Sequence, residues 1–365
     1  MSVLIFFVVL FVLILVHEWG HFIVAKKTGM RVDEFGIGFP PKLFGIKRGE
    51  TEYTFNLLPI GGFVKIWGEN GEENPFAANE RLDNSRSFGS RPKWAQALVL
   101  VAGVTMNILF AWMLFSATYM IGVPTGVSEE SASESAQMYV AGVLPGSPAE
   151  NIPLGSIITS IKNGSEELTS PTPSKFTDFI GDVGGAEVVV SYTYKGVDYE
   201  DVLVPESNLI EDNPDKYIIG TSLSMVDTVK KPFFAAIKDG FVATYSGLAG
   251  IVVGLFTLIS ESFVGQADFS QVAGPVGIVG MVGDAASYGI TALLTFTAII
   301  SLNLAVINLL PFPALDGGRL VFVAIESVTR KQIPPQWAGR INLIGFGILM
   351  LLMIAVTYND ILRLL

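Results

Sequence analysis

The chain has 365 residues, of which 50% are hydrophobic and only 16% are charged. Because soluble domains contain about 25% charged residues, this composition indicates a membrane protein. The chain has no cysteine, which excludes disulfides, iron–sulfur clusters and thiolate metal sites. Its net charge of −11 gives no sign of nucleic-acid binding, so we expect the lipid bilayer, and no nucleic acid, among its partners.

Four stretches of the chain are apolar enough to cross a bilayer, whose core takes about 20 residues of helix. Apart from a motif in the first stretch, they contain no Asp, Glu, Lys or Arg. They are residues 2–25, 94–128, 285–315 and 341–359. We therefore predict an α-helical multi-pass membrane protein with four transmembrane helices.

The first of these stretches contains the sequence HEWGH, which includes the only two histidines of the chain, His17 and His21. On a helix these residues lie on one face, so both imidazoles can bind one Zn²⁺ with Glu18 beside them as a general base. HExxH also occurs by chance in long proteins, and the side chains could simply pair within a helix bundle. Ionisable residues inside a membrane nevertheless indicate a functional site by default.

Residues 26–93 connect the first two spans and include the sequence TEYTFNLLPIGGFVKIWGE at 51–69. Apolar and polar residues alternate over 51–57, which is typical of a strand, and the PIGG sequence at 59–62 predicts a turn. Residues 63–67 then form the return strand of a predicted β-hairpin. This hairpin is unusually apolar, so it either enters the membrane or belongs to an ordinary cytoplasmic sheet.

Residues 137–225 are the one segment with the character of a soluble domain. Clusters of Gly, Pro, Ser and Asn separate five short runs that are typical of strands. These runs are 138–144, 156–162, 187–194, 197–204 and 217–223. With one helix predicted at 173–182, the segment is expected to be a small β-rich module inserted between membrane helices.

The charges between the spans predict the orientation of the chain. Residues 26–93 carry 11 Lys and Arg against 9 Asp and Glu, and residues 316–340 carry 4 against 2. Residues 128–239 carry 7 against 18. Because short cytoplasmic loops are enriched in Lys and Arg, we expect the first two segments in the cytoplasm, and the acidic module and both termini outside.

A third zinc ligand must be a carboxylate or a weaker group, since no Cys and no further His exists. Asp316 is the candidate, because it follows an apolar span that Pro311 and Pro313 interrupt. Irregular backbone at membrane depth is tolerated where it lines a cavity. The alternative is that Asp316 only caps the helix predicted at 319–335.

Asn303 and Asn308 lie in the same span as the two prolines. Amides in a membrane can hydrogen-bond a peptide substrate or simply join two helices. We predict a substrate role for Asn308, beside the broken helix, and leave both roles open for Asn303.

The sequences HEWGH and NLLPFPALDGG together resemble the site-2 protease family of intramembrane zinc metalloproteases, whose motifs are HExxH and NxxPxPxxDG. The chain is most similar to the bacterial branch that includes the regulator of sigma-E protease. That branch also has a membrane-reentrant β-hairpin, a GxxxN motif, here Gly103 to Asn107, a PDZ domain and a GPxGI segment, here at 274–278.

This resemblance implies an enzyme that hydrolyses peptide bonds in or near the transmembrane segments of single-span proteins, such as anti-sigma factors or signal-peptide remnants. It implies a bacterial cytoplasmic membrane location and Zn²⁺ as cofactor, with His17, His21 and Asp316 as ligands and Glu18 as the catalytic acid and base. It also implies substrate contacts along the hairpin edge and from Asn308, and Asn303 stays a further candidate from its place in the span. These expected contact residues are Gly61, Gly62, Phe63, Val64, Asn303 and Asn308.

The chain departs from the family pattern at two places. Val104 stands where a proline is usual, and Ser156 stands where the PDZ pattern usually has Asp. The second departure weakens the case that a PDZ domain here grips a C-terminal carboxylate. There is room for a single PDZ domain, which we expect to contact peptides or substrate ectodomains.

A fifth apolar stretch, residues 240–260, is uncharged for 21 residues. If it crossed the membrane alone, Asp316 would emerge on the face opposite to the two histidines and could not share their zinc. We therefore predict an interfacial or reentrant segment; the alternative is a hairpin of two crossings, 240–260 and 269–283. The predicted domains are then 1–128, 129–228 (the PDZ-like domain), 229–284 (the interfacial segment) and 285–365.

Two other functional classes compete with a protease. A metal transporter would place ionisable residues at several depths in several spans, whereas here they converge at one depth. A catalytically silent, PDZ-bearing membrane scaffold would have lost Glu18 or a ligand, and the chain has all of them.

Overall fold

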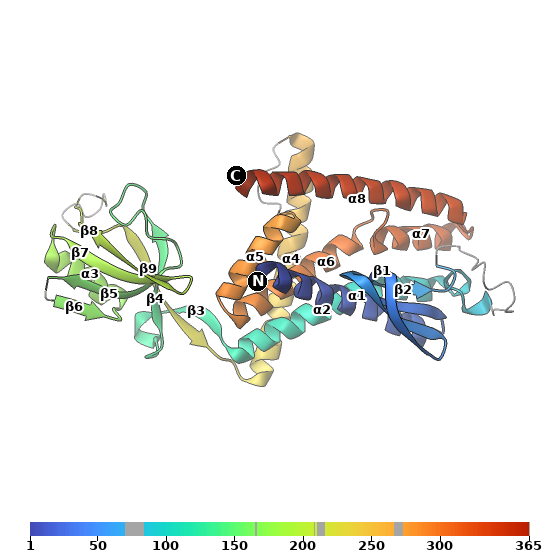
Figure 1. Ribbon diagram of the computed structural model, residues 1–365, viewed down its shortest axis with the longest axis horizontal. Helices are drawn as coiled ribbons and strands as arrows, with labels where there is room; N and C mark the ends of the chain where they lie inside the picture. The colour runs from blue at the N-terminus through green and yellow to red at the C-terminus, as the bar shows by residue number, and fades with distance from the viewer. Residues whose placement is uncertain (70–83, 165, 208, 210–215, 266–272, 365) are drawn as a thin grey trace. The chain divides into compact units, whose positions relative to one another are not determined.

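The computed structural model describes the chain except for residues 70–83, 165, 208, 210–215, 266–272 and 365. It forms two compact units. The first unit comprises residues 1–117 and 234–365 and contains the apolar helices and a two-stranded β-ribbon (Figure 1). The second unit comprises residues 118–233 and is built around a β-sheet.

The first unit consists mainly of helices, because a backbone in lipid must satisfy its hydrogen bonds within its own segment. Its helices are α1 (Ser2–Lys27), α2 (Lys93–Ile121), α4 (Phe233–Val264), α5 (Pro275–Ser287), α6 (Ile290–Leu309), α7 (Asp316–Thr329) and α8 (Pro335–Leu364). Among the described residues, α1, α2, α4, α6 and α8 are long and apolar enough to cross a membrane.

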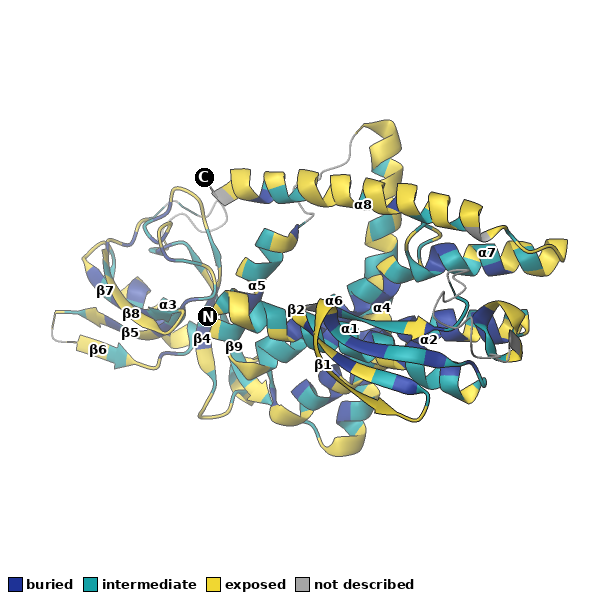
Figure 2. Cartoon of the chain, turned by 45° about the vertical axis from the view of Figure 1, so that its right-hand side comes forward, coloured by how far each residue is buried: buried dark blue, intermediate teal, exposed yellow. Residues whose placement is uncertain are grey.

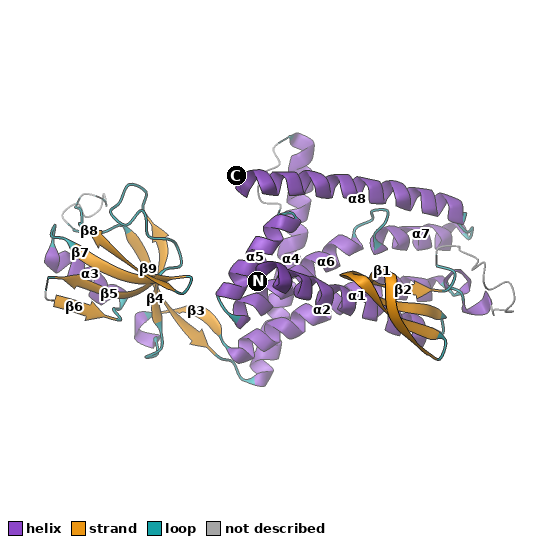
Figure 3. Ribbon diagram, viewed as in Figure 1, coloured by secondary structure: helices purple, strands orange, loops and turns teal. Residues whose placement is uncertain are grey.

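Four of these helices correspond to the four predicted spans. The span predicted at 94–128 is too long, since α2 ends at Ile121 and the strand β3 follows (Figure 3). The span predicted at 285–315 is also too long, because α6 ends at Leu309, two residues before Pro311. Proline lacks the amide hydrogen that a helix interior needs.

Helix α4 adds a fifth candidate span by length and composition, and only 6% of its most apolar window is buried. It runs crosswise to α8 in Figures 1 and 2. The prediction that residues 240–260 do not cross the membrane therefore stays a prediction, and residues 266–272 of the predicted interfacial segment lie outside the described chain. Figure 2 shows that α4 and α8 are mostly exposed, as expected for apolar helices that face lipid.

The β-ribbon between α1 and α2 differs from the predicted hairpin. Its strands are β1 (Val32–Arg48) and β2 (Thr51–Ile66). The start of β1 lies between the two arms of β2: Phe35 pairs with both Tyr53 and Val64. The two arms predicted to pair with each other are therefore separated by β1. Between the arms, Gly61 has φ +107°, a conformation that L-residues other than glycine rarely adopt.

Two apolar clusters join the elements around the candidate site. One joins the end of α1, the β-ribbon, the start of α2 and α7, and includes Ala25, Val32, Ile66, Val99 and Val323. The other joins α2 to α6 and includes Ala111, Leu114, Phe115, Ala298 and Leu302. The two clusters fix α2 between the helix that carries the histidines and the helix that leads to Asp316.

The second unit is a seven-stranded antiparallel sheet with one covering helix. Six strands follow the order β3-β9-β4-β5-β7-β8, and β6 pairs with β5. The strands are β3 (Val123–Val127), β4 (Gln137–Val143), β5 (Ile157–Asn163), β6 (Glu166–Thr169), β7 (Val188–Tyr194), β8 (Val197–Leu203) and β9 (Thr221–Val229). Helix α3 (Pro173–Val183) buries Phe176 and Ile180 in the core of this sheet.

Four of the five strands predicted from sequence correspond to β4, β5, β7 and β8, and the predicted helix corresponds to α3. The run predicted at 217–223 overlaps β9 only at 221–223. Alternate residues of β7 are buried (Val188, Val190 and Tyr192), which is the period-2 pattern that made the strand visible. The prediction missed β3 and β6, which have five and four residues. Strands this short are too brief to show a period.

Candidate metal centre

Helix α1 presents His17 and His21 to helix α2. The two side chains lie one turn apart, and each residue is only 8% exposed. The helices approach closely at Gly20, where an added Cβ would lie 2.5 Å from the carbonyl oxygen of Ala102. This glycine therefore lets the backbone of α2 reach the two imidazoles.

The helical structure is interrupted between α6 and α7, and this interruption places Asp316 beside His17 and His21. Asp316 is the first residue of α7. The break is tight, because a Cβ on Gly317 or Gly318 would collide with backbone carbonyls of residues 309–312. A hydrogen bond to α8 also stabilises this interruption: Asn342 Oδ1 accepts a hydrogen bond of 3.2 Å from the backbone amide of Ala314.

Three potential ligand atoms converge at this point. His17 Nε2 lies 3.0 Å from Asp316 Oδ2 and 3.1 Å from His21 Nε2, and His21 Nε2 lies 3.3 Å from Asp316 Oδ2. A tetrahedral zinc with ligands at about 2.0–2.1 Å separates neighbouring ligand atoms by about 3.3 Å. The three atoms thus fit one face of a zinc tetrahedron, and the fourth corner is left for a water or a substrate.

The second ring nitrogen of His21 has the partner that a metal-binding histidine needs. His21 Nδ1 lies 2.8 Å from the carbonyl oxygen of Val99, which can only accept a hydrogen bond. The proton of His21 therefore sits on Nδ1, and the lone pair of Nε2 is directed at the other two ligand atoms.

Glu18 lies between this cluster and the β-ribbon. An added Cβ on Gly62 of β2 would lie 3.7 Å from Glu18 Cγ. A cavity of about 340 Å³ opens beside the cluster, and it is lined by Ile14, His17, Glu18, Asn107, Leu304, Asn308, Ala314, Leu315 and Asp316. Glu18, two of the three potential ligands (His17 and Asp316) and two amides (Asn107 and Asn308) thus line one cavity.

The profile of the family described as peptidase family M50 matches residues 5–352 of the chain. The chain belongs to peptidase family M50. A protein of Clostridium perfringens whose name includes the words zinc metalloprotease is 37% identical, over 96% of this chain and 95% of its own length. The zinc metalloprotease RasP of Oceanobacillus iheyensis is 30% identical, with 100% of both chains covered. The regulator of sigma-W protease RasP of Bacillus subtilis is 28% identical, over 100% of this chain and 99% of its own length.

This M50 chain is accordingly a zinc metalloprotease of the site-2 protease family, with Zn²⁺ as its cofactor. Its apolar helices make it a multi-pass protein of the inner membrane. Its family and relatives associate it with regulated intramembrane proteolysis. The resemblance to the site-2 protease family, stated from the sequence motifs, is therefore confirmed.

Only some of the predicted substrate-binding residues of the M50 chain lie next to the cavity or to Glu18. Asn308 lines the cavity, Gly62 lies beside Glu18, and Val64 follows two positions later in β2. Asn303 Nδ2 instead donates a hydrogen bond of 2.9 Å to the carbonyl of Ile299 in its own helix, and Asn303 is absent from the described residues that line the cavity. Gly61 and Phe63 flank this part of β2, where the Phe63 ring stacks on Phe39.

Two residues of α2 belong to the site although they were not among the predicted site residues. A Cβ on Gly103 would lie 2.5 Å from His21 Nε2 and 2.7 Å from His17 Nε2, so the absence of a side chain makes room for both rings. Asn107, one turn later, contacts His17 and lines the cavity. The signal was the GxxxN spacing, because an amide in an uncharged span needs a polar partner.

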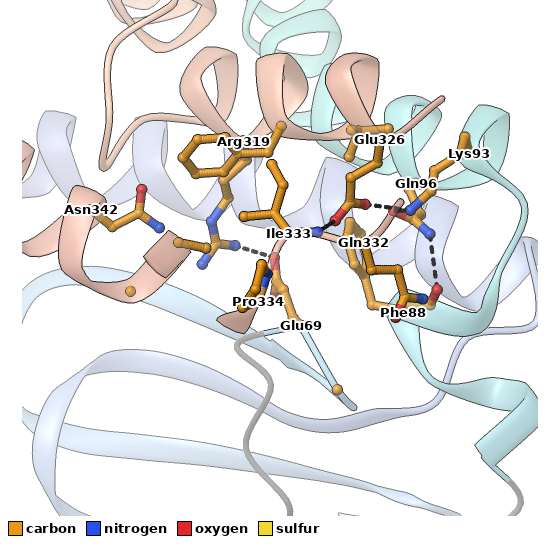
Figure 4. Close-up of a pocket in the computed structure, with 16 residues that line it drawn as sticks. Glu69, Phe88, Lys93, Gln96, Arg319, Glu326, Gln332, Ile333, Pro334 and Asn342 are labelled. Carbon is orange, nitrogen blue, oxygen red and sulfur yellow. Dashed lines mark hydrogen bonds and ion pairs between the residues drawn. The ribbon is translucent and has the colours of Figure 1, made fainter. Parts of the chain in front are cut away.

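A second cavity of about 760 Å³ lies beyond Asp316, between the end of β2, the start of α2, and helices α7 and α8 (Figure 4). Two ion pairs cross it. Arg319 of α7 pairs with Glu69, which follows β2, and Lys93 of α2 pairs with Glu326 of α7 at 2.5 Å. The helix that starts with Asp316 is thus tied both to the β-ribbon and to α2.

Proposed function

We propose that His17, His21 and Asp316 bind the catalytic zinc and that Glu18 is the catalytic acid and base. The observation that carries this proposal is the separation of the three ligand atoms, 3.0 to 3.3 Å, among residues up to 299 positions apart in the chain. A cluster of two histidines and a carboxylate with one free corner is the usual ligand set of a catalytic zinc.

The zinc ion, when bound, supplies Lewis acidity that polarises the scissile carbonyl and lowers the pKa of a water molecule. Glu18 accepts the proton of the attacking water and then delivers it to the leaving amine, so that the peptide bond breaks as the new carboxyl group forms. Glu18 lines the same cavity as His17 and Asp316, so its carboxylate is near the proposed metal position.

The proposed substrate is a peptide bond in or near the transmembrane segment of a single-span protein. A helical substrate hides its carbonyls in i to i−4 hydrogen bonds and must unwind before cleavage. Among the described pairings, residues 62–66 of β2 pair with β1 along one edge only, so their other edge is available to an added strand. Asn308 would supply a further hydrogen bond from the cavity wall.

The class of substrate is proposed from a relative. The Bacillus subtilis protein is named for regulating sigma-W, which favours a membrane-bound anti-sigma factor as substrate, with signal-peptide remnants as a second class. Both are single-span proteins, whose juxtamembrane segment could reach a site at this depth.

We further propose the topology that a shared zinc site requires. Residues 26–93 and 316–340 face the cytoplasm, and both termini and the unit at 118–233 lie outside. That unit, an antiparallel sheet with one helix, is proposed to be a PDZ-like domain that contacts substrate ectodomains. Helix α4 is proposed to lie along the outer surface, which its direction relative to α8 supports.

The test is cleavage of a single-span substrate, already trimmed outside, by membranes that contain wild type or Glu18→Gln. The variant keeps the shape of the side chain but cannot take up the proton. We expect its cleavage rate to fall by at least about 10²-fold, the usual contribution of a general base. Cleavage at the wild-type rate would overturn the role of Glu18.

A further inference from the structure

Asn107 is a fully buried amide with a polar atom that lacks a partner. The residue is 0% exposed and lies on α2 against His17. Its Oδ1 atom is buried and accepts no hydrogen bond from the described residues. An unpaired buried amide oxygen costs about 1–3 kcal/mol, so the contact between Asn107 and His17 calls for a physical explanation.

The two proposed histidine ligands differ in the partner of their second nitrogen. His21 donates from Nδ1 to a carbonyl oxygen of α2, which leaves Nε2 free to bind a metal. The Nδ1 atom of His17 instead faces Asn107 Nδ2 at 3.3 Å. If Nδ2 donated this hydrogen bond, Nδ1 would be the acceptor and the proton of the neutral ring would sit on Nε2. A protonated Nε2 has no lone pair for zinc.

A half-turn of the Asn107 amide about its Cβ–Cγ bond gives Oδ1 a partner and removes the conflict with zinc binding. The two ends of a carboxamide have almost the same shape, so the turn exchanges Oδ1 and Nδ2 without new collisions. The oxygen then stands where Nδ2 stands, 3.3 Å from His17 Nδ1, and accepts the Nδ1–H hydrogen bond. Oδ1 gains the partner that it lacked, Nδ2 takes the buried position that Oδ1 left, and Nε2 of His17 keeps its lone pair.

We propose that Asn107 is a positioning residue whose Oδ1 accepts a hydrogen bond from His17 Nδ1–H and so holds His17 Nε2 ready for zinc. This inference rests on the proposed zinc ligands. One face of helix α2 then contacts both histidines. The carbonyl oxygen of Val99 accepts a hydrogen bond from His21, Gly103 leaves space for the two rings, and Asn107 Oδ1 accepts a hydrogen bond from His17. The spacing of four residues between each pair places all three groups on one side of the helix.

The position of Asn107 is itself fixed by the neighbouring helix. Ser301 of α6 is fully buried, and its Oγ donates a hydrogen bond of 2.8 Å to the backbone carbonyl of Asn107. The amide is therefore anchored at its backbone by α6, while its side chain faces α1. This arrangement offers a matched control, because removing the Ser301 hydroxyl loosens the same helix contact without touching His17.

The first test measures zinc affinity of the full chain in detergent by competition with a chelator, for wild type, Asn107→Leu, Asn107→Asp and Ser301→Ala. Loss of such a partner typically weakens metal binding about 10- to 100-fold, and we expect this for Asn107→Leu. Asn107→Asp keeps an acceptor oxygen and Ser301→Ala keeps the amide, so both should bind within a few-fold of wild type. Wild-type affinity in Asn107→Leu, or an equal loss in Asn107→Asp, would overturn the inference.

The second test uses the fact that the chain has only two histidines, so ¹⁵N-histidine labelling gives four ring-nitrogen signals. In zinc-loaded wild type we expect both rings to carry their proton on Nδ1, and in Asn107→Leu the His17 proton should exchange faster with water. A His17 ring protonated on Nε2 in zinc-loaded wild type would overturn the inference, even if the leucine variant did not fold. If zinc changed neither histidine, the proposed ligands would fail instead, so the two failures are distinguishable.

Discussion

At the scale of single residues, the metal centre depends on glycines at close contacts as much as on the ligand side chains. Gly20 lets α1 and α2 touch through their backbones, and Gly103 leaves the space that the two imidazole rings fill. The tight break before α7 depends on Gly317 and Gly318 in the same way. The ligands are therefore held by close packing of backbone, which tolerates little added volume.

A methyl group at Gly103 should displace the histidines. In Gly103→Ala the new Cβ would lie within 2.5–2.7 Å of both rings, and overpacking of this kind costs about 1–3 kcal/mol. We expect weaker zinc binding by about that free energy, measured by chelator competition. Gly250→Ala on α4, where no atom lies within 4 Å of the new Cβ, is the matched control. Equal zinc affinity in the two variants would show that the rings do not need this space.

At the scale of elements, the β-ribbon and helix α7 are held together by charges on the proposed cytoplasmic side. The Arg319–Glu69 pair links the end of β2 to the helix that begins with Asp316 (Figure 4). Glu50, at the turn between β1 and β2, pairs with Lys26 at the end of α1 and with Arg86. Together these contacts set the ribbon edge beside Glu18.

The Arg319–Glu69 pair should couple substrate positioning to catalysis. Glu69→Gln and Arg319→Gln should each lower the cleavage rate several-fold, and the double variant should lose much less than the product of the two losses. The Lys93–Glu326 pair, which crosses the same cavity but does not reach the ribbon, serves as the control. If the losses from Glu69 and Arg319 simply multiply, the two side chains do not act as a pair.

Glu50 gives the ribbon a dependence on pH. Its hydrogen bonds to Arg86, and secondarily to Lys26, lower the pKa of Glu50 to about 2. Because the folded pKa lies below the unfolded one, the stabilisation is fully present above about pH 4.5 and is lost as the pH falls toward 2. The difference in unfolding temperature between wild type and Glu50→Gln should therefore be constant from pH 8 to 5 and shrink below 4.5. A difference that stays constant down to pH 3 would contradict this role.

At the scale of the whole molecule, the chain forms two units, for which we propose chemistry in one and recognition in the other. The unit of residues 1–117 and 234–365 holds all the atoms of the candidate metal centre, and the unit of residues 118–233 has its own core around Phe176 and Ile161. The topology that joins them depends on α4, which is apolar enough to cross but is proposed to lie along the outer surface.

Single cysteines can test that topology cleanly, because the chain has none of its own. Lys238→Cys and Ser262→Cys lie near the two ends of α4, with Glu200→Cys as the outside control and Arg48→Cys as the cytoplasmic control. With a membrane-impermeant maleimide on intact cells, we expect both α4 positions to react like position 200. Protection of position 262 together with position 48 would show that α4 crosses the membrane.

The sequence predicted a shared site for His17 and Asp316, because Asp316 follows the apolar span that Pro311 and Pro313 interrupt, and the structure places His17 Nε2 3.0 Å from Asp316 Oδ2. Hydrophobic runs likewise located the long helices, since lipid leaves the backbone few alternatives. Strand β1 was missed because Pro40, Pro41 and several glycines conceal its alternation. The orientation of the Asn107 amide lay beyond any pattern, since it depends on a hydrogen bond between side chains 90 residues apart.

The most direct test of the account is the zinc content of the purified full chain, measured by atomic emission for wild type, Glu18→Gln and Asp316→Ala. We predict about one zinc per chain in wild type and in Glu18→Gln, because Glu18 is proposed to move protons and not to bind the ion. We predict that Asp316→Ala retains little or no zinc. A full complement of zinc in Asp316→Ala would contradict the proposed site.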